Sequence, residues 1–207
     1  LKHRVKSVVA KVIAERKVQL LAYRDTLTNL PNRLLFADRL EQSLIRSERG
    51  RTSMALMLID IDDFKLVNDS FGHDAGDKLI KAVGELIAKS LRRADTIARL
   101  GGDEFAVIIE GIDGPEDAIS IADNLTTILE HNVRLDDQET YTSASIGIAV
   151  YPEDGKDART LLKNADTAMF RAKENGRHCF QFYKPEMSVN AMERLDLENN
   201  LKSAFEN

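Results

Sequence analysis

The sequence predicts an α/β or α+β domain in which helices pack against one mixed sheet. The apolar run at 54–59 has charged residues on both sides and the length of a strand that is buried on both faces. Later segments place apolar residues at helical spacing, and these segments alternate with β-branched runs. Two adjacent glycines at 101–102 lie between such runs, which indicates a tight hairpin.

The order of the elements follows from the same patterns. We expect a strand at 54–59, a helix at 77–91, a hairpin at 99–109, a helix at 115–129, a strand at 142–150, a helix at 157–175 and a strand at 179–183. Pro115 suits the first turn of a helix, and Gly176 suits the end of one.

Composition limits the class of protein. The chain has 207 residues, 43% of them hydrophobic and 30% charged, which fits a soluble protein with one sizeable core. The net charge of -5 argues against a nucleic-acid groove. Its single cysteine, Cys179, cannot form an internal disulfide and suggests a reducing compartment, so we expect a cytoplasmic location. The histidines are scattered without zinc spacing, and no apolar run approaches the ~20 residues that cross a bilayer.

The predicted hairpin places Asp103 and Glu104 directly after Gly101 and Gly102. Glycine allows another backbone or a phosphate to come close, and adjacent carboxylates repel each other unless a cation neutralises them. A metal with a phosphorylated ligand is therefore one interpretation. A solvated turn is the other.

The strand at 54–59 leads into Asp60, Asp62 and Asp63. A buried strand that ends in carboxylates delivers them to the end of a sheet, where a neighbouring hairpin tip can meet them. Hard oxygen ligands of this kind suit Mg²⁺, which prefers one or two carboxylates together with substrate phosphates. The alternative is that Asp60 ends the strand or caps a helix, and that Asp62 and Asp63 belong to the first turn of that helix.

Several motifs follow one another in a fixed order, at 25–33, 60–65, 68–77, 101–105, 145–149 and 165–177. Together they resemble the motifs of GGDEF domains, most of which are diguanylate cyclases that condense two GTP into cyclic di-GMP. The resemblance covers about residues 25–184. Asn29 occupies a position where the family often has Gly, and Asn tolerates the left-handed conformation. The family's fold is a ferredoxin-like palm, shared with nucleotidyl cyclases and polymerases.

The resemblance implies a metal-dependent site. It assigns the metal ligands to Asp60, Asp103, Glu104 and the main-chain carbonyl of Ile61, with two Mg²⁺ or Mn²⁺ in each active site. Asp60, Asp103 and Glu104 are then the catalytic residues, and Asp103 reaches a metal or the attacking hydroxyl.

The same resemblance assigns the guanine to Asn68 and Asp77. A carboxylate can accept hydrogen bonds from N1 and N2 of guanine together, and adenine lacks that pattern of donors. The alternative is that Asp77 caps its helix and Asn68 makes a turn.

The triphosphate is assigned to cations and main-chain N–H groups. The residues are Lys65, Lys173 and Arg177, with the N–H groups near Asp63 and Phe64, while Gly101 and Gly102 leave room for the nucleotide. The alternative is that Lys173 and Arg177 are only cations near the C-terminus of a helix, where positive charge is favourable.

Arg92 and Asp95 precede the hairpin and resemble the Arg-x-x-Asp site at which family members bind their product, cyclic di-GMP, and are inhibited by it. Arginine suits such a ligand because it clamps phosphate and stacks on bases. The alternative is a solvated cluster of charges that closes a helix.

The two ends of the chain have helical patterns. Residues 1–23 form a predicted amphipathic helix that either signals from an upstream sensor and helps to pair two copies, or packs on its own domain. The resemblance implies a GGDEF domain at 24–185, and 186–207 resemble a linker to an EAL phosphodiesterase domain, although a plain terminal helix has the same pattern. Because the chain begins with Leu1, we expect it to be a segment of a longer protein.

The function that these features favour is a diguanylate cyclase. One chain holds one GTP and the reaction consumes two, so the enzyme should be a homodimer with facing half-sites. One alternative is a GTP-binding module that no longer cyclises and regulates an adjacent EAL domain. The other is a purely structural dimerisation domain.

Overall fold

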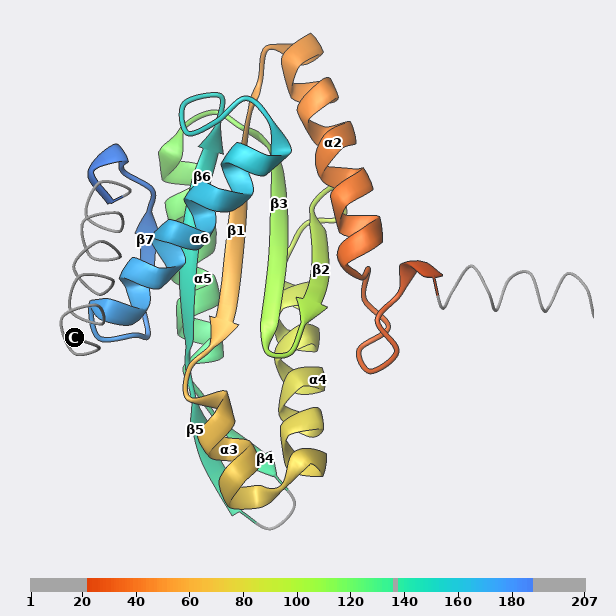
Figure 1. Ribbon diagram of the computed structural model, residues 1–207, viewed down its shortest axis with the longest axis vertical. Coiled ribbons are helices and arrows are strands. Elements are labelled where there is room, and N and C mark those ends of the chain that lie inside the picture. The colour runs from red at the N-terminus through yellow and green to blue at the C-terminus, as the bar shows by residue number, and fades with distance from the viewer. Residues whose placement is uncertain (1–21, 136–137, 188–207) are drawn as a thin grey trace, which may run out of the picture.

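A computed structural model describes residues 22–135 and 138–187, and its fold confirms the predicted class (Figure 1). Five strands form one mixed sheet in the order β2-β3-β1-β6-β7. The predicted helices at 1–23 and 186–207 lie almost entirely outside the described residues. In the described part of the chain, no helix has the length and apolar character needed to span a membrane.

The central strand is β1 (Ser53–Ile61), which is the apolar run of the sequence. It pairs antiparallel with β3 (Glu104–Ile112) on one side and with β6 (Ala144–Tyr151) on the other. All its residues after Ser53 are buried because helices cover both faces of the sheet. This double cover explains why β1 has no polar face in its sequence.

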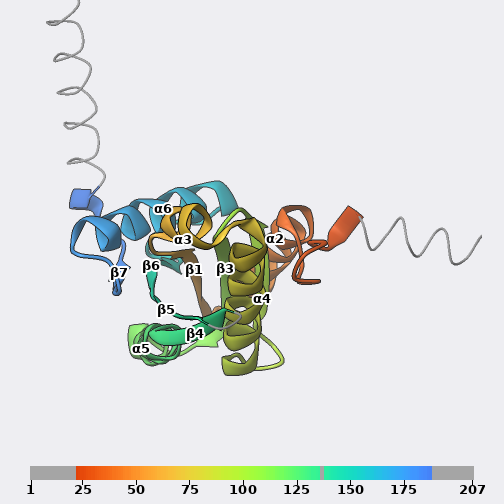
Figure 2. The same ribbon diagram turned by 90° about the horizontal axis from the view of Figure 1, so that it is seen from below.

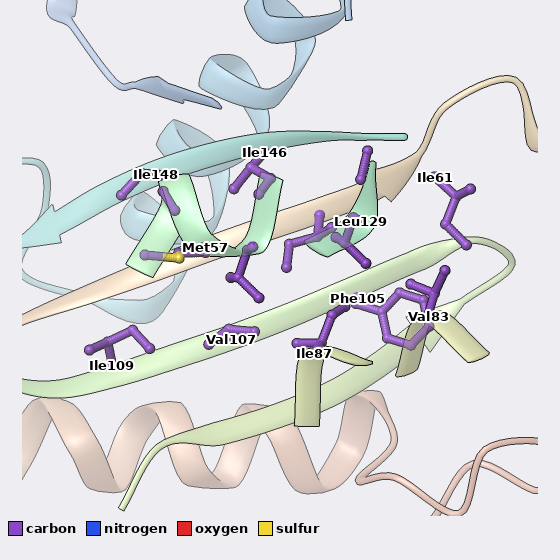
Figure 3. Close-up of a cluster of buried hydrophobic side chains, with 14 of the residues drawn as sticks. Met57, Ile61, Val83, Ile87, Phe105, Val107, Ile109, Leu129, Ile146 and Ile148 are labelled. Atoms are coloured by element: carbon purple, nitrogen blue, oxygen red, sulfur yellow. The ribbon is translucent and has the colours of Figure 1, made fainter. Parts of the chain in front are cut away.

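Alternate residues of the strands supply two separate cores. Met57, Ile59 and Phe105 face α4 (His73–Ser90) and α5 (Pro115–Leu129), as Figure 3 shows for part of this cluster. Leu56 and Leu58 face α2 (Arg33–Gly50) and α6 (Ala158–Glu174) on the opposite side of the sheet (Figure 2).

The remaining elements complete the edges and one end of the sheet. β2 (Thr96–Gly101) forms one edge, and β7 (Phe180–Phe182) runs parallel to β6 at the other. The short helix α3 (Phe64–Phe71) follows β1 directly. A separate hairpin consists of β4 (His131–Leu135) and β5 (Gln138–Thr142).

The structure refines some predicted bounds. α4 begins at His73 rather than Asp77, because Gly72 at φ 84° ends α3 and starts the next helix. The strand predicted at 142–150 is interrupted at Ser143, where β5 has ended and β6 has not begun. Asn29 has a φ of 58°, which is the left-handed conformation expected of it.

Candidate functional site

The predicted site residues gather at one end of the sheet. Figure 1 shows the end of β1, the turn between β2 and β3, the start of α3 and the last turns of α6 at this end. Most of the predicted residues lie on these four elements. Arg92 and Asp95 do not, because they precede β2 at its opposite end from the hairpin turn.

Two carboxylates face each other across neighbouring strands. Asp60 near the end of β1 is the register partner of Glu104 at the start of β3. Both continue the alternation of Leu58 and Ala106, so their side chains lie on the face that α2 and α6 cover. Asp103 lies in the adjoining turn, where its carbonyl accepts the N–H of Ile61 at 3.4 Å. The fold therefore pairs Asp60 with Glu104 and places Asp103 in the adjoining turn, and their role as metal ligands stays a prediction.

Cations lie next to these carboxylates. Lys173 Nζ in the last turn of α6 is 2.7 Å from Asp60 Oδ1, and Arg33 Nη2 is 3.7 Å from Glu104 Oε2. Burial raises the pKa of Asp60, and the charges of Asp103 and Glu104 raise it further, while Lys173 opposes both effects. The site thus combines concentrated negative charge with a lysine that can also reach an anionic ligand.

The donor set fits a hard divalent cation. Within residues 22–135 and 138–187, no three His, Cys, Asp or Glu side chains are grouped closely enough to hold a metal ion. Asp60 and Glu104 are a pair of carboxylates, which is the number that Mg²⁺ takes when substrate phosphates and water complete its coordination. We therefore regard the two carboxylates as suited to a metal that arrives with a phosphorylated ligand.

The start of α3 is suited to phosphate. Asp63 precedes the helix at φ 53° and its side chain does not cap it. Leu66 N–H is the first in this helix to donate to Asp63 O, at 2.8 Å, so the N–H groups of Phe64 and Lys65 have no helical acceptor. Such groups bind anions. Arg177 Nε lies 3.6 Å from Asp63 Oδ1, so this arginine reaches the same place from beyond α6.

The predicted guanine residues lie where α3 packs on α4. A Cβ added at Gly76 would lie 2.0 Å from Asn68 Oδ1, so only a glycine leaves room for this side chain. Asp77 follows Gly76 in the chain and is exposed. The structure thereby places Asn68 beside the residue that precedes Asp77, and their role in base recognition stays a prediction.

The hairpin tip has a support that the sequence did not indicate. Arg99 donates through Nε and Nη2 to Gly102 O, at 3.0 and 2.7 Å, and through Nη1 to both oxygens of Asp25, at 3.0 Å. Although burial raises the pKa of Asp25, hydrogen bonds from Thr28 and Arg99 lower it below its ordinary value. Both residues lie within or beside quoted motifs, but 74 positions separate them, so only the fold reveals their contact.

Asp62 does not lie where the alternative interpretation of the sequence put it. It is not part of the first turn of a helix but lies before α3, and it is 7% exposed. Its carboxylate accepts hydrogen bonds from Ser143, Ser145 and His178. Asp63 likewise precedes the helix instead of belonging to its first turn.

The predicted product site is a separate location. Arg92 N–H donates to Asp95 Oδ2 at 2.9 Å in the turn between α4 and β2. Burial raises the pKa of Asp95 and outweighs its hydrogen bond from Arg92. Binding of cyclic di-GMP at this turn stays a prediction.

Open space borders the carboxylate pair. A cavity of about 370 Å³ lies between α2 and α6 and is lined by Leu58, Leu100, Glu104 and Met169 among others. A neighbouring cavity of about 310 Å³ also borders Glu104 and extends to Lys173. A ligand can therefore approach Glu104 and Lys173 from the α2 and α6 face.

A family model described as "Diguanylate cyclase, GGDEF domain" matches residues 22–179, which include every site element described above. The chain belongs to the GGDEF family.

Known relatives agree with this assignment. The chain is 44% identical over 193 residues to the bifunctional diguanylate cyclase/cyclic di-GMP phosphodiesterase MucR of Pseudomonas aeruginosa, covering 93% of the chain and 28% of MucR. It is 43% identical over 157 residues to the diguanylate cyclase TpbB of the same species, covering 75% of the chain and 36% of TpbB. This GGDEF chain thus spans about a quarter to a third of the length of these curated relatives.

A solved structure supports the fold directly. The GGDEF domain of PA1120 (TpbB or YfiN) from Pseudomonas aeruginosa superimposes with a TM-score of 0.80 at 39% identity, over 82% of this chain and 99% of that one. The palm-like cyclase fold is therefore confirmed.

Proposed function

We propose that this GGDEF domain is a diguanylate cyclase that joins two GTP molecules into cyclic di-GMP and releases pyrophosphate. The observation that supports this most is the pairing of Asp60 with Glu104 next to Lys173, at the same end of the sheet as the α3 N-terminus and Arg177. That arrangement supports the proposal because groups suited to a metal and groups suited to phosphate lie at one end of the sheet. In each step, the 3′-hydroxyl of one GTP attacks the α-phosphate of the other, and the bond to pyrophosphate breaks.

The metal ligands we assign are Asp60, Asp103, Glu104 and the carbonyl of Ile61. When bound there, two Mg²⁺ or Mn²⁺ would supply charge neutralisation at the phosphates and a lower pKa for the attacking hydroxyl. We assign Asp103 to that hydroxyl as well, because a carboxylate in the turn can accept its proton. Lys173 Nζ lies 2.7 Å from Asp60, close enough for it to contact a phosphate held at the same place.

The remaining substrate contacts divide between phosphate and base. Lys65, Arg177 and the N–H groups at the start of α3 would bind the triphosphate, and such catalysis depends mainly on positioning and charge stabilisation. Asn68 and Asp77 would read the guanine edge. Because the Asp77 carboxylate would accept from N1 and N2 of guanine and adenine lacks that pair of donors, Asp77→Ala should reduce the preference for GTP over ATP.

Each chain offers one such half-site, so the proposed enzyme is a homodimer. The partner chain would present the second GTP. At Arg92 and Asp95, we propose that cyclic di-GMP binds and inhibits, and Arg92→Ala should abolish that inhibition while the main site is unchanged. If the variant is still inhibited by cyclic di-GMP, Arg92 is not part of the inhibitory site.

The decisive experiment incubates the chain with GTP and Mg²⁺ and measures pyrophosphate and cyclic di-GMP by chromatography. Asp60→Asn and Glu104→Gln remove one charge each with little change in shape, and each should lower turnover about a hundredfold or more. Lys89→Gln, an exposed helical position in an ion pair with Glu85, is the control and should leave turnover unchanged. Full turnover in both carboxylate variants would contradict the proposal.

The second candidate is a weak or inactive GTP-binding module that regulates an adjacent phosphodiesterase. It is favoured by the likeness to MucR, whose name joins a cyclase with a phosphodiesterase. In that case the chain would bind GTP without releasing pyrophosphate, and GTP would change the activity of an attached EAL domain. The same incubation therefore separates the two functions.

A further inference from the structure

A buried carboxylate connects three parts of the site end of the sheet. Asp62 Oδ2 accepts hydrogen bonds from Ser143 Oγ at 2.7 Å and from the main-chain N–H of His178 at 3.0 Å. Its Oδ1 accepts a hydrogen bond from Ser145 Oγ at 2.6 Å. All three donors are neutral, and hydrogen bonds of this kind to a carboxylate are stronger than those between neutral groups. Asp62 therefore joins the end of β1 to the start of β6 and to the segment after α6.

The segment after α6 has an unusual backbone. Gly176, Arg177 and His178 have φ angles of 109°, 64° and 49°, so three successive residues lie in the left-handed region. Residues other than glycine keep this conformation only where their surroundings hold them. Two hydrogen bonds do so here, from Arg177 N–H to Ala172 O at 3.1 Å and from His178 N–H to Asp62.

Asp62 and His178 are joined by a hydrogen bond, and each of them is next in the chain to a residue that we assign to the phosphates. Asp63, which precedes α3, follows Asp62 in the chain, and Arg177 precedes His178. Arg177 Nε and Asp63 Oδ1 lie 3.6 Å apart. The carboxylate of Asp62 consequently holds both the start of α3 and Arg177 in place.

We propose that Asp62 is a positioning residue for the triphosphate. It holds Arg177 and the N-terminus of α3 at the spacing that one polyphosphate chain requires, without touching the nucleotide itself. This inference rests on the proposed function, because it presumes that GTP binds at this place.

The test compares Asp62→Ala, Arg177→Ala and the double variant of the full 207-residue chain by calorimetric titration with GTP. Asp62→Ala should weaken GTP binding about tenfold, because the arginine and the helix terminus lose their common anchor. In the Arg177→Ala background the same substitution should have a much smaller effect, since coupled residues are not additive. Guanosine, which has no phosphate, should bind all the variants and the parent chain with equal affinity.

Two further variants separate positioning from stability. Asp62→Asn keeps an oxygen for the His178 N–H and should restore most of the GTP affinity. Asp154→Ala is the matched control, since Asp154 Oδ2 accepts the N–H of Val150 at 2.7 Å near the opposite end of β6. It should lower the melting temperature but leave GTP affinity unchanged. Protection of the His178 amide from hydrogen exchange should be lost in Asp62→Ala only.

The outcomes distinguish this inference from the proposed function. A parent chain that does not bind GTP would overturn both. Additive losses for Asp62→Ala and Arg177→Ala, or an equal loss of guanosine and GTP affinity, would overturn the positioning role of Asp62 and leave the proposed cyclase standing.

Discussion

At Asp60, the proposed function and the stability of the fold have opposite requirements. It is 7% exposed, and burial raises its pKa above the ordinary value even with Lys173 alongside. The folded protein therefore binds a proton at Asp60 more readily than the unfolded chain does. The charged form that a metal needs is the form that the fold disfavours, and such conflicts are common at functional sites.

This conflict predicts a stabilising substitution. Between the ordinary pKa of an aspartate and the raised pKa of Asp60, the folded state binds more protons, so its stability falls as pH rises through that range. Asp60→Asn removes the ionisable group and should stabilise the chain by about 1 kcal/mol at pH 7. The gain should disappear at pH 3, where the carboxyl is protonated in both states.

Thermal unfolding of the parent chain and Asp60→Asn at several pH values measures this effect. The substitution should also lower turnover about a hundredfold or more, so stability and activity change in opposite directions. A variant that is less stable than the parent at pH 7 would show that the ion pair with Lys173 outweighs the cost of burial.

The hairpin between β2 and β3 is held as a unit by an ion pair at its base. Arg99 and Asp25 have side chains that are only 11% and 19% exposed, and Arg99 also binds the carbonyl of Gly102. The conformations of Gly101 and Gly102, with φ of 140° and 53°, are therefore fixed from outside the turn. The position of Glu104 relative to Asp60 depends on this support.

Arg99→Ala should destabilise the chain by about 2 kcal/mol, because it leaves Asp25 half-buried without its cation. The pKa of Asp25 is lowered in the fold, so its contribution is present above the ordinary pKa of an aspartate and is lost as pH falls through the lowered value. The variant should have a weaker dependence on pH, because the contribution of Arg99 is lost while the hydrogen bonds from Thr28 remain. Urea unfolding at pH 3 and pH 7 measures it, and an unchanged difference between the two values would contradict the prediction.

The close packing of α6 on β6 determines where Lys173 lies in the candidate site. A Cβ at Gly147 would lie 2.0 Å from the carbonyl oxygen of Ala165 and 2.2 Å from the main-chain N of Met169. The helix that carries Lys173 can approach β6 this closely only because residue 147 has no side chain.

Gly147→Ala should therefore destabilise the chain by about 3 kcal/mol, because backbone atoms and not a flexible side chain must move. Gly50→Ala is the matched control, as its Cβ would meet only Thr52, at 3.5 Å or more, at the end of α2. That variant should be neutral or slightly stabilising. Chemical denaturation measures both, and equal midpoints for the two variants would refute this account.

At the scale of the whole molecule, Glu104 is accessible to solvent, whereas its neighbour Asp60 is buried. The Glu104 side chain is 43% exposed, and the two cavities beside it are open to solvent on the α2 and α6 face. A second chain can therefore approach Glu104 from this side, as the proposed reaction between two bound nucleotides requires.

Because each proposed half-site holds one GTP, turnover per chain should rise with protein concentration until dimerisation is complete. Measuring initial rates over a thousandfold range of concentration, together with light scattering, tests this. The midpoint of the activity curve should coincide with that of dimer formation. A constant turnover per chain in a monomeric protein would contradict the half-site arrangement.

Much of this was predictable from the sequence. The apolar run of β1, the glycine pair of the hairpin and the helical spacing after Pro115 and after Asp157 are local patterns that reflect conformational preference and burial. The helix α2 was missed because its apolar stripe is narrow, and the hairpin of β4 and β5 was missed because its strands are short.

The sequence alone determined the fold class, the family resemblance and the carboxylates that meet at the end of β1. Only the tertiary structure decided which distant residues support this end of the sheet. Arg99 donates a hydrogen bond to Asp25 across 74 positions, and Asp62 accepts one from His178 across 116 positions. The physical reason is that strand and helix patterns record local burial, whereas a hydrogen bond between remote segments depends on packing that no local pattern contains.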